Sequence, residues 1–272
     1  MIGYGVSRGV FWGLFPYICL LMMIVGTIYR YQSDQLRWTS KSSKLLEKKL
    51  LILGSVTFHI DILFVFVGHI LGLLIPIQLY HTLEISSELY HAAAIILGGA
   101  SGLIALFGIS VLLYRRIAVE CVRMDTDISG YIADGPLLIV VLLGVIFTLG
   151  YNIASGSYEY RATVGPWIRD IIALHPDVGL MAGAPFVLQL HIALAFLLFG
   201  ISPFTRLIHI YSFPVAYLTR VPLLYRTHYG YEHEHKREPE PQPHAPRWAS
   251  LHSRRPPMSP HSPNSWMRLN TR

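Results

Sequence analysis

Five long apolar stretches constrain how this 272-residue chain can fold. They are Gly9–Tyr29, Leu50–Pro76, Ala92–Tyr114, Gly135–Tyr151 and Gly183–Phe204. As a helix with a rise of ~1.5 Å per residue, each has about the length needed to cross ~30 Å of hydrocarbon. Only 14% of the residues are charged, whereas soluble domains carry about 25%. We therefore predict an all-α membrane protein with a bundle of five transmembrane helices, and an ordinary soluble enzyme is excluded.

The distribution of Lys and Arg predicts the orientation of this bundle. Nineteen of the 22 basic residues fall on one side of the five stretches, and Arg8, Arg161 and Arg169 fall on the other. Basic residues collect on the cytoplasmic side of membrane proteins. We expect a multi-pass protein of the cell's inner or plasma membrane, with its N-terminus outside and its C-terminus in the cytoplasm. The net charge of +6 then reflects topology, and no nucleic-acid partner is expected.

The composition changes after about Leu224. Eight of the 17 prolines lie between Pro239 and Pro263, among His, Arg, Ser and Glu. A segment of this composition cannot bury a core. We predict a transmembrane domain at 1–224 and a disordered cytoplasmic tail at 225–272.

Four histidines lie within or next to the apolar stretches. His59 and His69 belong to the second, in VTFHIDILFVFVGHILG, His191 belongs to the fifth, and His209 follows the fifth by five residues. An ionisable group is expensive at membrane depth and faces the bundle interior or a cofactor. A single such histidine is as readily a core residue bonded to a carbonyl, but two pairs on two helices favour axial ligation of haem iron. The two cysteines form no Cys-x-x-Cys pair, which excludes a covalently attached haem and an iron–sulfur cluster. Two b-type haems are therefore expected.

The topology suggests how the four histidines pair. The second and fifth stretches are antiparallel, which sets His59 level with His209 near the cytoplasmic face and His69 level with His191 further out. The separations are ~15 Å on one helix and ~27 Å on the other. The mismatch of ~12 Å would have to be absorbed by helix tilt, ligand reach or a bend at Pro203. Spacing alone does not settle the pairing.

Three motifs resemble a known family. They are FHIDILFVFVGHILGLLIP, LGGASGLIALFGISVLLYRR and PFTRLIHIYSFPVAYLTR. Together they resemble the gamma subunit of respiratory nitrate reductase, a di-haem cytochrome b, from about Phe15 to Leu224. The resemblance implies quinol oxidation near the outer face and electron flow inward to an iron–sulfur beta subunit and a molybdenum-containing alpha subunit. It implies that His69 and His191 hold the outer haem, and that His59 and His209 hold the inner one.

The same resemblance directs attention to a quinol site. The family's best-studied members carry a lysine near the start of the third span that helps to hold the quinol. The matching position here is Tyr90, with His91 beside it, and both can hydrogen-bond a quinone oxygen. Gly68, next to His69, leaves room for a ring to approach. We therefore predict that Gly68, Tyr90 and His91 bind quinol.

Three arginines at cytoplasmic helix ends have two interpretations. Arg115, Arg116 and Arg206 either pair with propionates of the inner haem, since guanidinium binds carboxylate in a bidentate manner, or anchor the helices in the ordinary way.

The overall function has two alternatives as well. One is the same quinol-oxidising role in a sulfur-metabolising or heterodisulfide-reductase-like complex. The other is a membrane anchor or transporter whose histidines hold no haem.

Overall fold

The computed structural model describes residues 2–33 and 46–211 of the chain. Within these ranges the regular structure is helical and no strand occurs. Five helices are long and apolar enough to cross a membrane, namely Gly9–Ser33, Lys49–Leu74, Ser87–Ala118, Ile128–Ser155 and Phe186–Phe204. The predicted all-α bundle with five spans is confirmed. The expected tail at 225–272 lies outside the described residues.

The spans are assembled from ten α-helices and several tighter or wider helical turns. The α-helices are α1 (Ile2–Ser33), α2 (Lys49–His69), α3 (Ile77–Thr82), α4 (Ser87–Ala93), α5 (Gly99–Ala118), α6 (Glu120–Asp125), α7 (Ile128–Val145), α8 (Asn152–Ser155), α9 (Val164–Ile172) and α10 (Phe186–Ile201). The π-helical turns are η2 (Ile70–Leu74), η3 (Ala94–Gly98) and η4 (Ile146–Tyr151). The 3₁₀ turns are η5 (Val178–Met181), η6 (Ser202–Phe204) and η7 (Arg206–Tyr211).

The fourth span begins earlier than its apolar stretch predicts. The stretch starts at Gly135, whereas the span starts at Ile128. Asp134 interrupts the apolar run in the sequence, yet its carboxylate forms an ion pair with Arg116 of α5. A buried charge is tolerated when it is paired, so the helix continues through this position.

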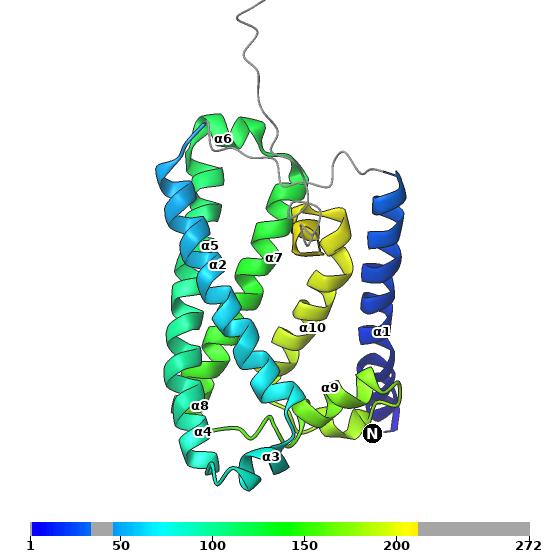
Figure 1. The fold of residues 1–272 in the computed structure, drawn as a ribbon. Coiled ribbons are helices and arrows are strands. Elements are labelled where there is room, and N and C mark those ends of the chain that lie inside the picture. The colour runs from blue at the N-terminus through cyan, green and yellow to red at the C-terminus, as the bar shows by residue number, and fades with distance from the viewer. Residues whose placement is uncertain (1, 34–45, 212–272) are drawn as a thin grey trace, which may run out of the picture. The chain divides into compact units, whose positions relative to one another are not determined.

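The long helices pack in a fixed order (Figure 1). α2 packs along α5, α5 along α7, α7 along α10, and α10 along α1. Backbones approach closely where α2 meets α5, since a Cβ on Gly108 would lie 2.6 Å from the backbone nitrogen of Phe58. Small residues permit such close approach between helices in lipid.

Short elements cover the end of the bundle at which the N-terminus lies (Figure 1). These are α3, α4, α9 and the loop at 156–163, which precedes α9. The side chain of Trp167 in α9 is fully buried and meets Trp12 of α1 edge to face. Arg169 of α9 donates a hydrogen bond of 2.8 Å to the carbonyl of Leu73, at the end of the second span. α6 lies at the opposite end. The distribution of Lys and Arg predicts that the end covered by these short elements faces outward, so this end is the outer end of the bundle.

Candidate functional site

The structure brings the four histidines together as two facing pairs. The ring centroids of His59 and His209 are 6.1 Å apart, and those of His69 and His191 are 6.2 Å apart. The first pair joins α2 to η7, and the second joins α2 to α10. Two imidazole–metal bonds of about 2 Å, with about 1 Å from each nitrogen to its ring centre, span about 6 Å. Both pairs therefore have the separation of two axial ligands on one metal ion.

A second feature common to the four histidines is a backbone partner for Nδ1. His59 donates to the carbonyl of Ser55 and His69 to that of Val65, each at 2.7 Å. His191 and His209 donate to the carbonyls of Val140 and Arg206, at 2.9 Å and 2.6 Å. In the neutral ring, a proton held on Nδ1 leaves Nε2 unprotonated, and the hydrogen bond fixes the ring orientation. Histidines that bind a metal through Nε2 usually donate from Nδ1 in this way.

The surroundings of these pairs fit a haem better than a bare metal ion. Across the described ranges, no group of three or more His, Cys, Asp or Glu side chains lies close enough to hold a metal ion. Two histidines suffice when a macrocycle supplies the remaining ligands, as in a b-type haem. Gly144 of α7 also leaves room for the ring of His191, since a Cβ there would lie 3.1 Å from its Cε1.

The structure also resolves the mismatch in histidine spacing. α10 ends at Ile201, and η6 follows with Pro203 near its start. Thr205 then takes an extended conformation, with φ −118° and ψ −176°. His209 therefore lies on a separate helical turn, and its height is not set by counting residues along α10. The expected bend at Pro203 is a complete break in the helix.

The three arginines named as propionate contacts each bond a carboxylate of this chain. The side chain of Arg115 is 3% exposed, and its Nε lies 2.7 Å from Oε2 of Glu47. Desolvation opposes ionisation of Glu47, but hydrogen bonds from the Leu50 amide and from Arg115 outweigh it and lower its pKa.

The other two arginines also bridge elements. Arg116 pairs with Asp134, and Nη2 of Arg206 lies 3.0 Å from Oδ1 of Asp127. The first pair joins α5 to α7, and the second joins η7 to the residue that precedes α7. The propionate role remains a prediction.

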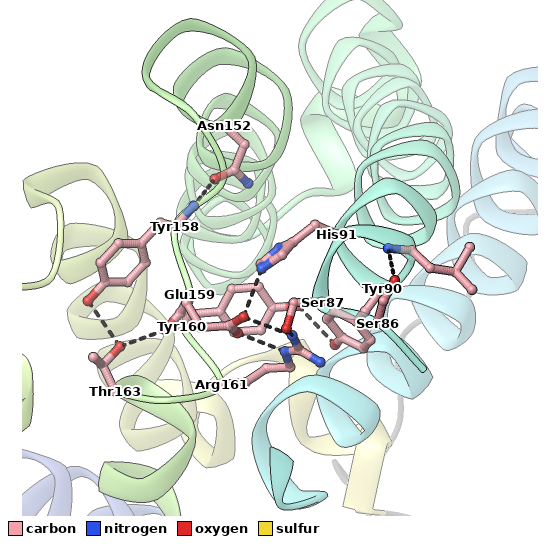
Figure 2. Close-up of polar contacts among 11 residues, drawn as sticks. Ser86, Ser87, Tyr90, His91, Asn152, Tyr158, Glu159, Tyr160, Arg161 and Thr163 are labelled. Carbon is pink, nitrogen blue, oxygen red and sulfur yellow. Dashed lines mark hydrogen bonds and ion pairs between the residues drawn. The ribbon is translucent and has the colours of Figure 1, made fainter. Parts of the chain in front are cut away.

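Two of the predicted quinol residues lie in a polar network at the outer end (Figure 2). Nε2 of His91 is 3.0 Å from Oε2 of Glu159. The hydroxyl of Tyr90 is 3.0 Å from that of Tyr160. Both contacts join α4 to the loop at 156–163.

A buried arginine lies at the centre of this outer network. The side chain of Arg161 is 1% exposed and donates to both carboxylate oxygens of Glu159, at 2.7 Å and 2.8 Å. It also donates to Oγ of Ser87 at 3.3 Å, and its Cζ lies 3.8 Å from the ring centre of Tyr90. A guanidinium over an aromatic face is a cation–π contact, so Arg161 holds both sides of the network.

The charge states of this network follow from these contacts. Burial favours the neutral form of Glu159, but hydrogen bonds from Arg161 and His91 outweigh it and hold its pKa below the ordinary range. The hydrogen bond to Glu159 raises the pKa of Arg161. Burial, followed by the hydrogen bond with Tyr90, raises the pKa of Tyr160. The network therefore consists of a fixed anion, a fixed cation and a neutral phenol.

Gly72 links this network to the second span, whereas Gly68 does not contact it. Gly72 lies three residues after His69, and a Cβ there would be 2.8 Å from the Tyr160 ring and 3.0 Å from the Tyr90 hydroxyl. The outer network thus packs on the turn that follows a histidine of the outer pair. At Gly68, the third predicted quinol residue, a Cβ would meet no atom within 4 Å. No side chain of the described residues therefore fills the space directly beside Gly68.

Sequence reasoning missed Glu159, Tyr160 and Gly144, and it treated Arg161 only as a charge that reports topology. Alternation of aromatic and charged residues in Tyr158–Arg161 is the signal that could have found the loop residues. Nothing in the sequence around Gly144 indicates that it faces His191, because that contact joins two helices.

Comparison with known proteins gives consistent similarities. The family model described as nitrate reductase gamma subunit matches residues 8–228. The chain is 44% identical to the nitrate reductase gamma chain of Bacillus subtilis (strain 168) over 221 residues, which covers 81% of this chain and 99% of that protein. It is 36% identical to the respiratory nitrate reductase 1 gamma chain of Escherichia coli (strain K12), covering 77% of this chain and 93% of that one. It is 37% identical to the nitrate reductase-like protein NarX of Mycobacterium tuberculosis (strain ATCC 25618 / H37Rv), covering 80% of this chain and 34% of that longer protein.

Proposed function

Because the chain belongs to the nitrate reductase gamma subunit family, we propose that it oxidises quinol and passes the electrons inward through two b-type haems. Family membership and the five spans make it a multi-pass membrane subunit of a nitrate reductase. The proposal adds the cofactors, the electron donor and the direction of electron flow.

The observation that carries the proposal is the pair of facing histidine contacts. His59 with His209 would hold the inner haem, and His69 with His191 the outer one. The backbone carbonyls that accept from Nδ1 would orient the four rings and keep Nε2 available as the ligand atom. When bound, the haems supply one-electron carriers at two levels of the bundle.

The outer network supports the position of the quinol site. Gly68 leaves open space beside His69, and Tyr90 and His91 offer hydrogen-bonding groups at the same end. Quinol oxidised there would release protons outside while electrons travel inward, so that the reaction would contribute to the membrane potential. The proposed electron acceptors on the cytoplasmic side are the iron–sulfur beta subunit and the molybdenum-containing alpha subunit.

The ligand assignment is tested by single replacements with Leu. His69→Leu or His191→Leu should remove the same haem, because each leaves its pair with one ligand. His59→Leu or His209→Leu should remove the other haem. Pyridine haemochrome content and reduced-minus-oxidised spectra of the purified complex measure both outcomes. A wild-type complex from haem-replete cells with no b-type α band would refute the haem proposal, and pairing of His59 with His191 would refute the assignment.

The quinol site is tested by the double replacement Tyr90→Phe and His91→Leu. It should slow haem reduction by menadiol about tenfold or more, because a positioned base and a hydrogen-bonding group are both lost. Haem content and reduction by dithionite should not change, since neither residue is a proposed ligand. His81→Leu, an exposed histidine of α3, is the matched control. Unchanged menadiol kinetics in the double variant would place the site elsewhere.

A further inference from the structure

The contact between His91 and Glu159 defines the protonation of both side chains. Glu159 stays ionised because Arg161 donates to both of its oxygens. An ionised carboxylate can only accept hydrogen bonds, so Nε2 of His91 must be the donor across the 3.0 Å contact. In the neutral imidazole this leaves Nδ1 as the acceptor nitrogen.

We propose that Glu159 is the positioning residue of a carboxylate–imidazole pair, in which His91 is the base that accepts a proton from the quinol hydroxyl. The inference rests on the proposed function and names groups that the function requires. A carboxylate in this position does two things, as it does for the histidine of a serine hydrolase. It selects the tautomer whose free nitrogen can accept a proton, and it stabilises the imidazolium that forms.

Arg161 explains why the proton stays on His91 and does not pass to Glu159. The guanidinium holds both carboxylate oxygens and lowers the pKa of Glu159, so the carboxylate remains an anion next to the newly formed cation. Arg161 is itself buried and fixed over the ring of Tyr90. The positions of Glu159, and through it of His91, are therefore set before any quinol arrives.

The reaction balances with the components already named. Oxidation of one quinol breaks two O–H bonds and releases two protons and two electrons. One proton forms a bond with Nδ1 of His91 and then leaves to water, and the other is released to water directly. The haems, when bound at the histidine pairs, would accept the two electrons. The side chain of Glu159 is 32% exposed and that of His91 is 12% exposed, so Glu159 is the more exposed member of this pair.

Other charged and titratable groups near His91 do not compete for this role. Tyr160 faces it from the same loop as Glu159, and Tyr90 adjoins it on α4. Arg161 bonds Glu159 and lies over the ring of Tyr90. Tyr80 of α3 lies against Tyr90, and burial raises its pKa. The guanidinium of Arg161 has no atom that can accept a proton. The raised pKa values of Tyr160 and Tyr80 keep these phenols neutral.

The test is Glu159→Gln in the haem-loaded complex in membranes. Menadiol should reduce the haems about tenfold more slowly, because the base is weaker and less well oriented. The acid limb of the pH profile should move about one pH unit lower, because a neutral amide no longer stabilises the imidazolium. The rate at which diethyl pyrocarbonate carbethoxylates His91, measured by peptide mass spectrometry, should show the same shift in its pH dependence. This measurement does not depend on quinol oxidation.

Two further variants keep the test decisive. Glu88→Gln removes an exposed carboxylate from α4, the helix that carries His91, and should change none of these measurements. Glu159→Asp keeps the charge for Arg161 but shortens the reach to His91, and should give a smaller shift in the same direction. If the Glu159→Gln complex does not assemble, the Glu159→Asp variant tests the role of Glu159 by the same measurements.

The inference and the proposed function fail in different ways. Unchanged pH profiles and unchanged His91 modification in both Glu159 variants would overturn the inference, even if His91→Gln is slow with menadiol. Failure of the proposed function would appear instead as a wild-type complex without haem or without menadiol oxidation.

Discussion

Among the four histidines, His191 differs from the others in the backbone carbonyl that accepts its Nδ1 proton. His59, His69 and His209 donate to carbonyls of their own helical segments, three or four residues earlier. His191 donates across to Val140 of α7. The orientation of His191 therefore depends on the position of a neighbouring helix, and this makes the outer pair sensitive to changes on α7.

This dependence gives a prediction at Gly144. A Cβ at Gly144 would lie 3.1 Å from Cε1 of His191, so Gly144→Ala should push the ring aside. We expect a lower content or a shifted midpoint potential of the haem proposed at His69 and His191, with the other proposed haem unchanged. Gly135→Ala on the same helix meets no atom within 4 Å and serves as the control. Redox titration followed by visible spectroscopy measures both, and equal behaviour of the two variants would contradict the proposed contact.

Among the helices, the contact between α2 and α5 sets the position of both α2 histidines. Gly54 and Gly108 lie at this contact, and a Cβ on Gly54 would be 3.0 Å from the carbonyl of Gly108. Phe58, which packs on Gly108, directly precedes His59. Small residues here let the backbones approach, so the depth of α2 in the bundle is set by glycine.

Gly108→Ala tests this dependence at the scale of a helix pair. The new methyl group would lie 2.6 Å from the backbone nitrogen of Phe58, and backbone cannot move aside as a flexible side chain can. We expect a loss of stability of about 1–3 kcal/mol and a lower content of the haem proposed at His59 and His209. Gly98→Ala, at the other end of the same span, meets no atom within 4 Å and should behave as the wild type. Thermal unfolding in detergent, followed at the haem band, is the measurement.

Across the whole molecule, arginine–carboxylate contacts fasten both ends of the bundle. Arg115 with Glu47 joins α5 to the residues before α2 at the end where α6 lies. Arg161 and Glu159 join the loop at 156–163 to α4 at the other end. The helices between them are held mainly by packing, as expected where lipid replaces water as the solvent.

The predicted orientation of the molecule can be tested with its two native cysteines. Cys19 is 2% exposed, and Cys121 on α6 is exposed. If the N-terminus is outside, a membrane-impermeant maleimide should label Cys121 in inverted vesicles or after detergent, and not in intact spheroplasts. Ser157→Cys in a Cys121→Ser background places the only exposed cysteine of the described residues at the outer end and should label in spheroplasts. Labelling of Cys121 in intact spheroplasts would reverse the orientation.

The sequence alone determined the fold class and the elements that carry His59, His69 and His191, whereas His209 lies on η7 and not on the fifth helix. Uninterrupted apolar length specifies a membrane span regardless of what packs beside it, because lipid imposes this requirement on each helix separately. The expected facing of His59 with His209 and of His69 with His191 followed from chain direction together with the family resemblance. Their exact heights did not, because the break at Thr205 depends on local backbone conformation.

Only the tertiary structure decided what surrounds those residues. The Val140 carbonyl and Gly144 reach His191 from another helix, and Glu159 reaches His91 across 68 positions of the chain. Arg161 appeared in the sequence as one outer basic residue, and its burial against Glu159 and Tyr90 depends on how the loop at 156–163 folds over α4. Such contacts join segments with no common periodicity, so no local pattern records them. Hydropathy fixes which segments enter the membrane, whereas packing between them fixes which polar groups meet.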